Sequence, residues 1–93
     1  MLGKEQSFRE TSANLAHIQP GETVLDVGCG TGGLTLVAGE KVGSTGRVYG
    51  IDPAPEMIEL ASRKAIKARA NIDFRVGVVE KINFPDGTFD VVC

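Results

Sequence analysis

The sequence predicts an α/β fold in which a parallel sheet lies between two layers of helices. A short aliphatic run at 23–27 ends abruptly in glycines, and a helical pattern follows from about residue 33 to residue 41. Strand and helix patterns then alternate along the chain, which is typical of parallel sheets joined by right-handed crossovers. Because the glycine segment marks the switch point of the sheet, the expected strand order is 3-2-1-4.

Hydrophobic spacing and turn signals predict the later elements. The second strand is 47–52, and Pro55 suits the first turn of the helix that follows. Residues 72–76 alternate as a third strand, and the turn signal at 85–88 precedes a fourth strand at 89–93. The apolar side of the second helix is expected to contain Met57, Ile58, Ala61, Ala65 and Ala68.

The 93 residues are expected to form a single partial domain. Residues 1–20 are predicted to carry a leading amphipathic helix, from Ser7 to Ile18, and residues 21–93 the ligand-binding part. In the order 3-2-1-4 the fourth strand ends the sheet with an unpaired apolar edge. Such an edge is available to a second copy of the chain, which would make a homodimer.

The glycine loop is the first predicted binding element. Gly28, Gly30 and Gly32 allow tight turns and let a ligand approach the main chain, and the next helix presents its free N–H groups there. Two families of cofactor-binding protein use such a loop. The spacing Gly28-x-Gly30-x-x-Gly33 is also the fingerprint of dinucleotide-binding proteins, so the glycines alone leave both alternatives open.

Asp26, two residues before the first glycine, favours one of these alternatives. A carboxylate there would repel a pyrophosphate but suits a cationic ligand. With the run Gly28-Cys29-Gly30-Thr31-Gly32, the chain resembles the class I S-adenosylmethionine-dependent methyltransferases, which have a Rossmann-like fold, and within them the small-molecule branch of ubiquinone and menaquinone biosynthesis. This resemblance implies that Asp26 helps to hold the amino group of the methionine portion of S-adenosylmethionine. In the structural alternative, backbone N–H groups of the glycine loop bind the Asp26 carboxylate.

Asp52 ends the second predicted strand at the same edge of the sheet. A carboxylate can accept hydrogen bonds from both hydroxyls of a ribose, which S-adenosylmethionine and nicotinamide dinucleotides share. Capping of the helix near Pro55 is the structural alternative. The resemblance also places adenine near 77–80, although Val78 stands where the family commonly has an acidic residue. The full set of expected cofactor-binding residues is Asp26, Gly28, Cys29, Gly30, Thr31, Gly32, Asp52, Pro53, Met57, Val78, Val79 and Glu80.

Composition limits the other possibilities. The formal charge of −2 predicts neither a nucleic-acid partner nor a membrane partner, and the basic residues near 63–69 are expected to be solvated. The two cysteines and the single histidine show no metal-ligand spacing, so no metal site is expected. A disulfide at Cys29 would obstruct the loop, which favours a reducing compartment. With no signal peptide pattern, we expect a cytoplasmic protein.

The expected function is methyl transfer from S-adenosylmethionine to a small-molecule acceptor, with this chain supplying the cofactor-binding half. The resemblance covers only the front half of the family fold, and the sequence identifies neither the acceptor nor a catalytic residue. Two alternatives stay open: a fragment of a nicotinamide-dependent oxidoreductase, and a non-catalytic module that binds a nucleoside or assembles through its edge.

Overall fold

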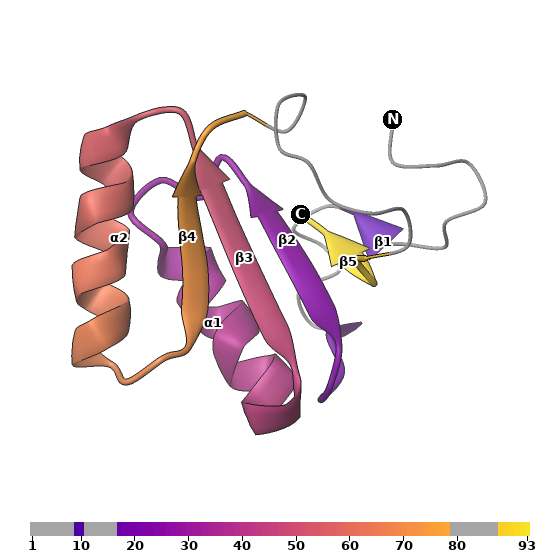
Figure 1. The fold of residues 1–93 in the computed structure, drawn as a ribbon. Helices are drawn as coiled ribbons and strands as arrows, with labels where there is room; N and C mark the ends of the chain where they lie inside the picture. The colour runs from indigo at the N-terminus through magenta and orange to yellow at the C-terminus, as the bar shows by residue number, and fades with distance from the viewer. Residues whose placement is uncertain (1–8, 11–16, 79–87) are drawn as a thin grey trace.

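A computed structural model describes residues 9–10, 17–78 and 88–93 of the chain. Its sheet has the order β1-β5-β2-β3-β4, and every neighbouring pair of strands is parallel (Figure 1). The predicted order 3-2-1-4 is therefore confirmed, as β4-β3-β2-β5. The strands are β1 (Arg9–Glu10), β2 (Thr23–Val27), β3 (Arg47–Asp52), β4 (Ile72–Val76) and β5 (Val91–Val92).

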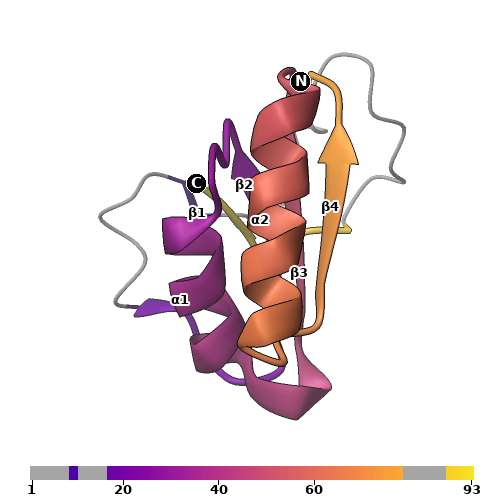
Figure 2. The same ribbon diagram turned by 90° about the vertical axis from the view of Figure 1, so that its left-hand side faces the viewer.

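Two α-helices lie on the same face of this sheet. Helix α1 (Gly33–Val42) connects β2 to β3 through the short 3₁₀ helix η2 (Gly43–Thr45), and α2 (Pro55–Lys67) connects β3 to β4. Both crossovers step across the sheet in the same direction, so their common right-handedness puts both helices on one side, as Figure 2 shows. The described residues thus contribute two of the three expected layers, the sheet and one helical layer.

Each face of the sheet has its own apolar cluster. On the helix side, valines of β2, β3 and β5 pack against Ala38 and Val42 of α1. On the other side, Leu25, Ile51 and Phe89 are buried, and the rings of Tyr49 and Phe89 meet edge to face with centroids 5.8 Å apart. Apart from Asp26, the buried residues of the central strand β2 are apolar on both faces, which explains its mainly hydrophobic sequence.

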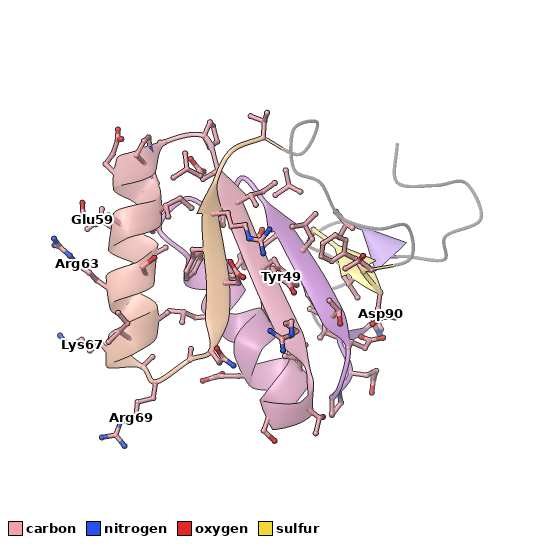
Figure 3. All side chains as sticks on the ribbon, viewed as in Figure 1. Tyr49, Glu59, Arg63, Lys67, Arg69 and Asp90 are labelled. Atoms are coloured by element: carbon pink, nitrogen blue, oxygen red, sulfur yellow. The ribbon has the colours of Figure 1, made fainter. Side chains whose placement is uncertain are left out.

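Helix α2 follows its sequence pattern closely. Pro55 stands in its first turn, and its outer residues Glu59, Arg63 and Lys67 point away from the sheet (Figure 3). Glu59 and Arg63 form an exposed ion pair with an Oε2–Nη2 distance of 2.9 Å. The helix ends when Arg69 adopts a left-handed conformation with φ of 57°, and the amides of Arg69 and Ala70 bond back to the last turn.

Ala68 was expected on the buried side of α2 but is exposed, because it lies just after the last helical residue. The remaining predicted positions of that side agree better with the structure: Ile58, Ala61 and Ala65 are buried, and Met57 is half-buried. The basic residues near the end of this helix are exposed, as predicted; they are Arg63, Lys64, Lys67 and Arg69.

The segment before β2 differs from its prediction. Arg9 and Glu10 form the strand β1, parallel to β5, where the apolar spacing predicted helix; the rest of 1–16 lies outside the described residues. Pairing satisfies the backbone groups of β5 that would otherwise be left open, and this tertiary interaction overrides a weak helical pattern. The expectation of an unpaired fourth-strand edge is therefore wrong along Val91 and Val92, and the expected homodimer depended on that edge.

We expect Gly46→Ala to lower the free energy of unfolding by about 1–3 kcal/mol, because there is no room for a side chain at this position. A Cβ on Gly46 would lie 2.3 Å from the Cβ of Val42 and 2.7 Å from the carbonyl oxygen of Glu22. Gly33→Ala is the control, since a Cβ there meets nothing within 4 Å and should change stability little. Urea denaturation of both variants would test this, and equal midpoints would contradict it.

Candidate functional site

The register between β2 and β3 determines where the candidate site lies. Asp26 is opposite Gly50, and Val27 is opposite Ile51, so the two strands end together. The Cys29 amide continues the pairing by donating to the Ile51 carbonyl oxygen at 2.9 Å. The glycine loop and Asp52 consequently lie at the same carboxyl edge, which is where open α/β sheets bind ligands.

The loop turns in conformations that favour glycine. Gly28 and Gly30 have φ of 69° and 57°, and a Cβ at either position would meet nothing within 4 Å. These two glycines therefore give an open main-chain surface. Gly32 has a different role, because a Cβ there would lie 3.0 Å from the Cβ of Ala61 and 3.3 Å from the ring of Phe74. Its missing side chain lets α2 and β4 pack against the loop.

Asp52 holds the loop in this shape. Its Oδ2 accepts a hydrogen bond from the Gly30 amide at 3.0 Å, and its Oδ1 accepts one from the Ala54 amide at 2.9 Å. The carboxylate thus joins the glycine loop to Ala54, the residue before α2. Within the described residues α2 has no side-chain capping bond, so the helix-capping alternative considered from the sequence is wrong for Asp52. Each carboxylate oxygen can accept a second hydrogen bond, which leaves room for the hydroxyls of a ribose.

Asp26 is in a different environment. It exposes only 4% of its surface, and its Oδ2 accepts a hydrogen bond from the Thr35 hydroxyl at 2.7 Å. Burial raises the pKa of Asp26 above its usual range, and the hydrogen bond from Thr35 partly opposes this shift. In the described part of the chain, Asp26 accepts its hydrogen bond from Thr35 rather than from the loop amides. A nearby cation would favour the ionised form of this carboxyl.

The two cysteines lie close to these carboxylates. Burial is the main cause that raises the pKa of the Cys29 thiol to about 11, and the negative charges of Asp26 and Asp52 add to the shift. The pKa of the Cys93 thiol is also raised to about 11, mainly by burial and further by the negative charge of Asp26. Both cysteines are free, and both thiols are protonated near neutral pH, so neither is activated as a nucleophile. Within the described residues, no group of side chains has the composition of a metal site.

The other predicted site residues lie around the same edge. Thr31 and Met57 are half-buried, and Pro53 is exposed. The Gly77 amide donates to the Asp52 carbonyl oxygen at 3.0 Å, which keeps the partly exposed Val78 next to the end of β3. Val79 and Glu80 lie outside the described residues.

Sequence reasoning missed two residues of the site. Thr35 occupies the first turn of the helix after the loop, where a hydroxyl can reach back to the preceding strand. Gly50 lies opposite Asp26 on β3, and a Cβ there would be 2.8 Å from Phe74 and 3.2 Å from the Cys29 sulfur. A glycine inside a strand is itself a sign of such close approach.

Two further features lie away from this edge. Asp90, labelled in Figure 3, accepts a hydrogen bond from the Thr23 amide at 2.8 Å, at the amino end of β2. A cavity of about 420 Å³ lies between the second half of α1 and the turn from α2 to β4. No helix of the described residues is long and apolar enough to cross a membrane.

The fold and the site define a parallel α/β protein with two carboxylates, Asp26 and Asp52, beside a glycine loop at the carboxyl edge of the sheet. Comparison with known proteins specifies the family. Residues 24–93 match a family described as "Methyltransferase domain". The solved structure of a SAM-dependent methyltransferase from Aquifex aeolicus is similar, with a TM-score of 0.75 and 37% identity, over 81% of this chain and 40% of that one. The chain belongs to the S-adenosylmethionine-dependent methyltransferases.

Two curated relatives act on small molecules according to their names. The aklanonic acid methyltransferase of a Streptomyces species is 49% identical over 73 residues, which are 77% of this chain and 33% of the relative. The demethylmenaquinone methyltransferase of a Geobacillus species is 39% identical over 87 residues, which are 91% of this chain and 37% of the relative. The chain thus spans little more than a third of the length of these relatives. The matches favour the methyltransferase interpretation of the loop over the dinucleotide one.

We expect Asp26→Asn to be more stable than the wild type at about pH 8. Burial raises the pKa of Asp26 in the folded protein above its value in the unfolded chain. The stability contributed by the protonated carboxyl is therefore complete at pH values below the unfolded-state pKa, and it is lost as the pH rises through the folded-state pKa. The variant has no such loss, so its advantage should shrink as the pH falls toward 3.8, the usual aspartate value.

Unfolding free energies of the two proteins measured across this pH range would test the expectation. Glu59→Gln is the matched control, because it removes an exposed negative charge in a surface ion pair of little energetic value. If the difference between wild type and Asp26→Asn stays constant with pH, the buried carboxyl does not titrate as argued.

Proposed function

We propose that this chain forms the S-adenosylmethionine-binding half of a methyltransferase that acts on a small-molecule acceptor. The observation that carries the proposal is the pair of carboxylates at the glycine loop. Asp26 is buried with a raised pKa beside the loop, and Asp52 is held by two amides at the end of the next strand. One carboxylate suits a cation and the other suits a pair of hydroxyls, and the cofactor offers both.

Asp52 would bind the ribose of the cofactor. Its two oxygens already accept one hydrogen bond each from backbone amides, which fixes the plane of the carboxylate before a ligand arrives. The remaining lone pairs can accept both ribose hydroxyls as charge-assisted hydrogen bonds. Because the amides are part of the loop and of the α2 start, the carboxylate cannot turn away without breaking them.

Asp26 would bind the amino group of the methionine portion. Thr35 occupies its Oδ2, and the carboxylate is nearly fully buried. An ammonium group would offset the desolvation that raises its pKa, so a cationic ligand fits this position better than a neutral or anionic one. A pyrophosphate at the loop would instead meet the negative charge of Asp26, which argues against a dinucleotide.

The remaining contacts would come from the loop and the neighbouring strand ends. Gly28 and Gly30 leave the main chain open for close approach, and we propose Cys29, Thr31 and Gly32 as further loop contacts. Pro53, Met57 and Val78 would border the nucleoside. Val79 and Glu80 remain predictions for the adenine side.

Bound S-adenosylmethionine supplies an electrophilic methyl group on a sulfonium. The described residues of this chain have the task of binding and orienting that group and of excluding water around it, which is where most of the rate enhancement of such a displacement arises. Both thiols near the loop are protonated at neutral pH, so neither is proposed as a base or nucleophile. We assign no catalytic residue within the chain.

The acceptor class is inferred from the relatives. Their names point to aklanonic acid and demethylmenaquinone, and we propose a small-molecule acceptor for this chain as well. A cytoplasmic location is proposed on the basis of the two free cysteines, which suit a reducing compartment.

We expect the chain to bind S-adenosylmethionine and S-adenosylhomocysteine in calorimetric titrations, and to bind a nicotinamide dinucleotide weakly or not at all. Asp52→Ala should weaken binding by roughly 1.5–3 kcal/mol, about 10- to 150-fold, through the loss of charge-assisted hydrogen bonds. Asp73→Ala is the control, because that carboxylate is partly exposed and pairs with Arg75 away from the loop.

The other outcomes distinguish the alternatives. Tighter binding of the dinucleotide would favour an oxidoreductase, and equal affinities of Asp52→Ala and wild type would contradict the ribose contact. Cofactor binding without methyl transfer to aklanonic acid or demethylmenaquinone, tested on a longer protein that contains this whole chain, would favour the non-catalytic module.

A further inference from the structure

Thr35 makes the hydrogen bond that controls the buried carboxylate of the site. Its side chain is completely buried, and its Oγ1 lies 2.7 Å from Oδ2 of Asp26. It is the third residue of α1, so the helix that starts at the glycine loop also carries the partner of Asp26. Within the described part of the chain, Asp26 accepts no other hydrogen bond.

We propose that Thr35 is a positioning residue, which aims the Asp26 carboxylate at the cationic amino group of the bound ligand and keeps that carboxylate charged. The inference depends on the proposed function, since it assumes that Asp26 meets the amino group. Thr35 occupies Oδ2, so the other oxygen is left for the ligand. Without this anchor the carboxylate would be free to rotate in its pocket.

The chemistry of a hydroxyl suits this role better than that of an amide. A hydroxyl donates to an ionised carboxylate and can turn to accept from a protonated one, whereas the backbone amides that hold Asp52 only donate. The bond to the ionised carboxylate is charge-assisted and therefore the stronger of the two, so the hydroxyl favours the charged form of Asp26 while still tolerating the neutral one. We expect Asp26 to be the carboxylate whose charge responds to the ligand.

The electrostatic surroundings of Asp26 make the hydrogen bond important. Burial raises the pKa of Asp26, and the bond from Thr35 is the opposing influence. Among the described residues, the other titratable groups near Asp26 are the thiols of Cys29, from the loop, and Cys93, from the end of β5, which stay protonated near neutral pH. Asp52 adds a second negative charge near Cys29. None of these groups supplies a positive charge to hold Asp26 in its ionised form.

Two variants test the role of the hydroxyl. Thr35→Val keeps the shape of the side chain but removes the donor, and Thr35→Ser keeps the donor but removes a methyl group. Two ligands test the role of the amino group. S-adenosylhomocysteine carries it, while 5′-methylthioadenosine has the same nucleoside without the amino-acid portion.

We expect Thr35→Val to weaken S-adenosylhomocysteine binding about 2- to 10-fold at neutral pH and to leave 5′-methylthioadenosine binding unchanged. The pH below which affinity for S-adenosylhomocysteine declines should move upward in Thr35→Val, because Asp26 then takes up its proton at a higher pH. Thr35→Ser should keep the wild-type pH profile. Titration of the Asp26 carboxyl carbon by NMR, without ligand, should show the same upward shift in Thr35→Val alone.

The possible contrary results separate the two proposals. Equal weakening of both ligands by Thr35→Val, or an Asp26 titration identical to that of the wild type, would show that Thr35 has only a structural role. Failure of the wild type to bind S-adenosylhomocysteine would overturn the proposed function, and with it the aiming of Asp26 at an amino group.

Discussion

The parallel register between β2 and β3 is the constraint on which the rest of the site depends. It brings Asp26 opposite Gly50 and ends both strands at one edge, so that the loop after β2 meets the carboxylate at the end of β3. The backbone bond from Cys29 to Ile51 and the bond from Gly30 to Asp52 are consequences of that register. A slip of one residue would send Asp26 to the opposite face, away from Thr35 and α1.

The two carboxylates show how one residue type acquires two functions from its surroundings. Asp52 is partly accessible and is held by backbone donors, which suits a neutral, hydroxyl-rich ligand group. Asp26 is buried, with one adaptable hydroxyl as its partner, which suits a ligand group that brings its own positive charge. Neither difference follows from the residue identities, because burial and hydrogen bonding arise only when α1 folds back onto β2.

Much of the fold could be predicted from the chain itself. The strands at 23–27, 47–52 and 72–76 were predicted with the bounds that the structure has, because their flanking glycines and prolines punctuate the chain clearly. The order of these strands followed from the glycine segment, which marks the switch point of the sheet. The strand at Arg9 and Glu10 could not be predicted, because a two-residue strand has no pattern of its own and forms only when β5 offers an edge.

The sequence by itself determined the glycine loop, the two acidic positions around it and the alternation of strands and helices, since these depend on local backbone freedom and hydrophobic spacing. Only the tertiary structure decided that Thr35 is the partner of Asp26, that Gly50 makes room for Cys29 and Phe74, and that β1 covers β5. These features join residues from separate elements. Contacts of that kind depend on how the elements pack against one another, and hydrophobic periodicity within one element does not predict them.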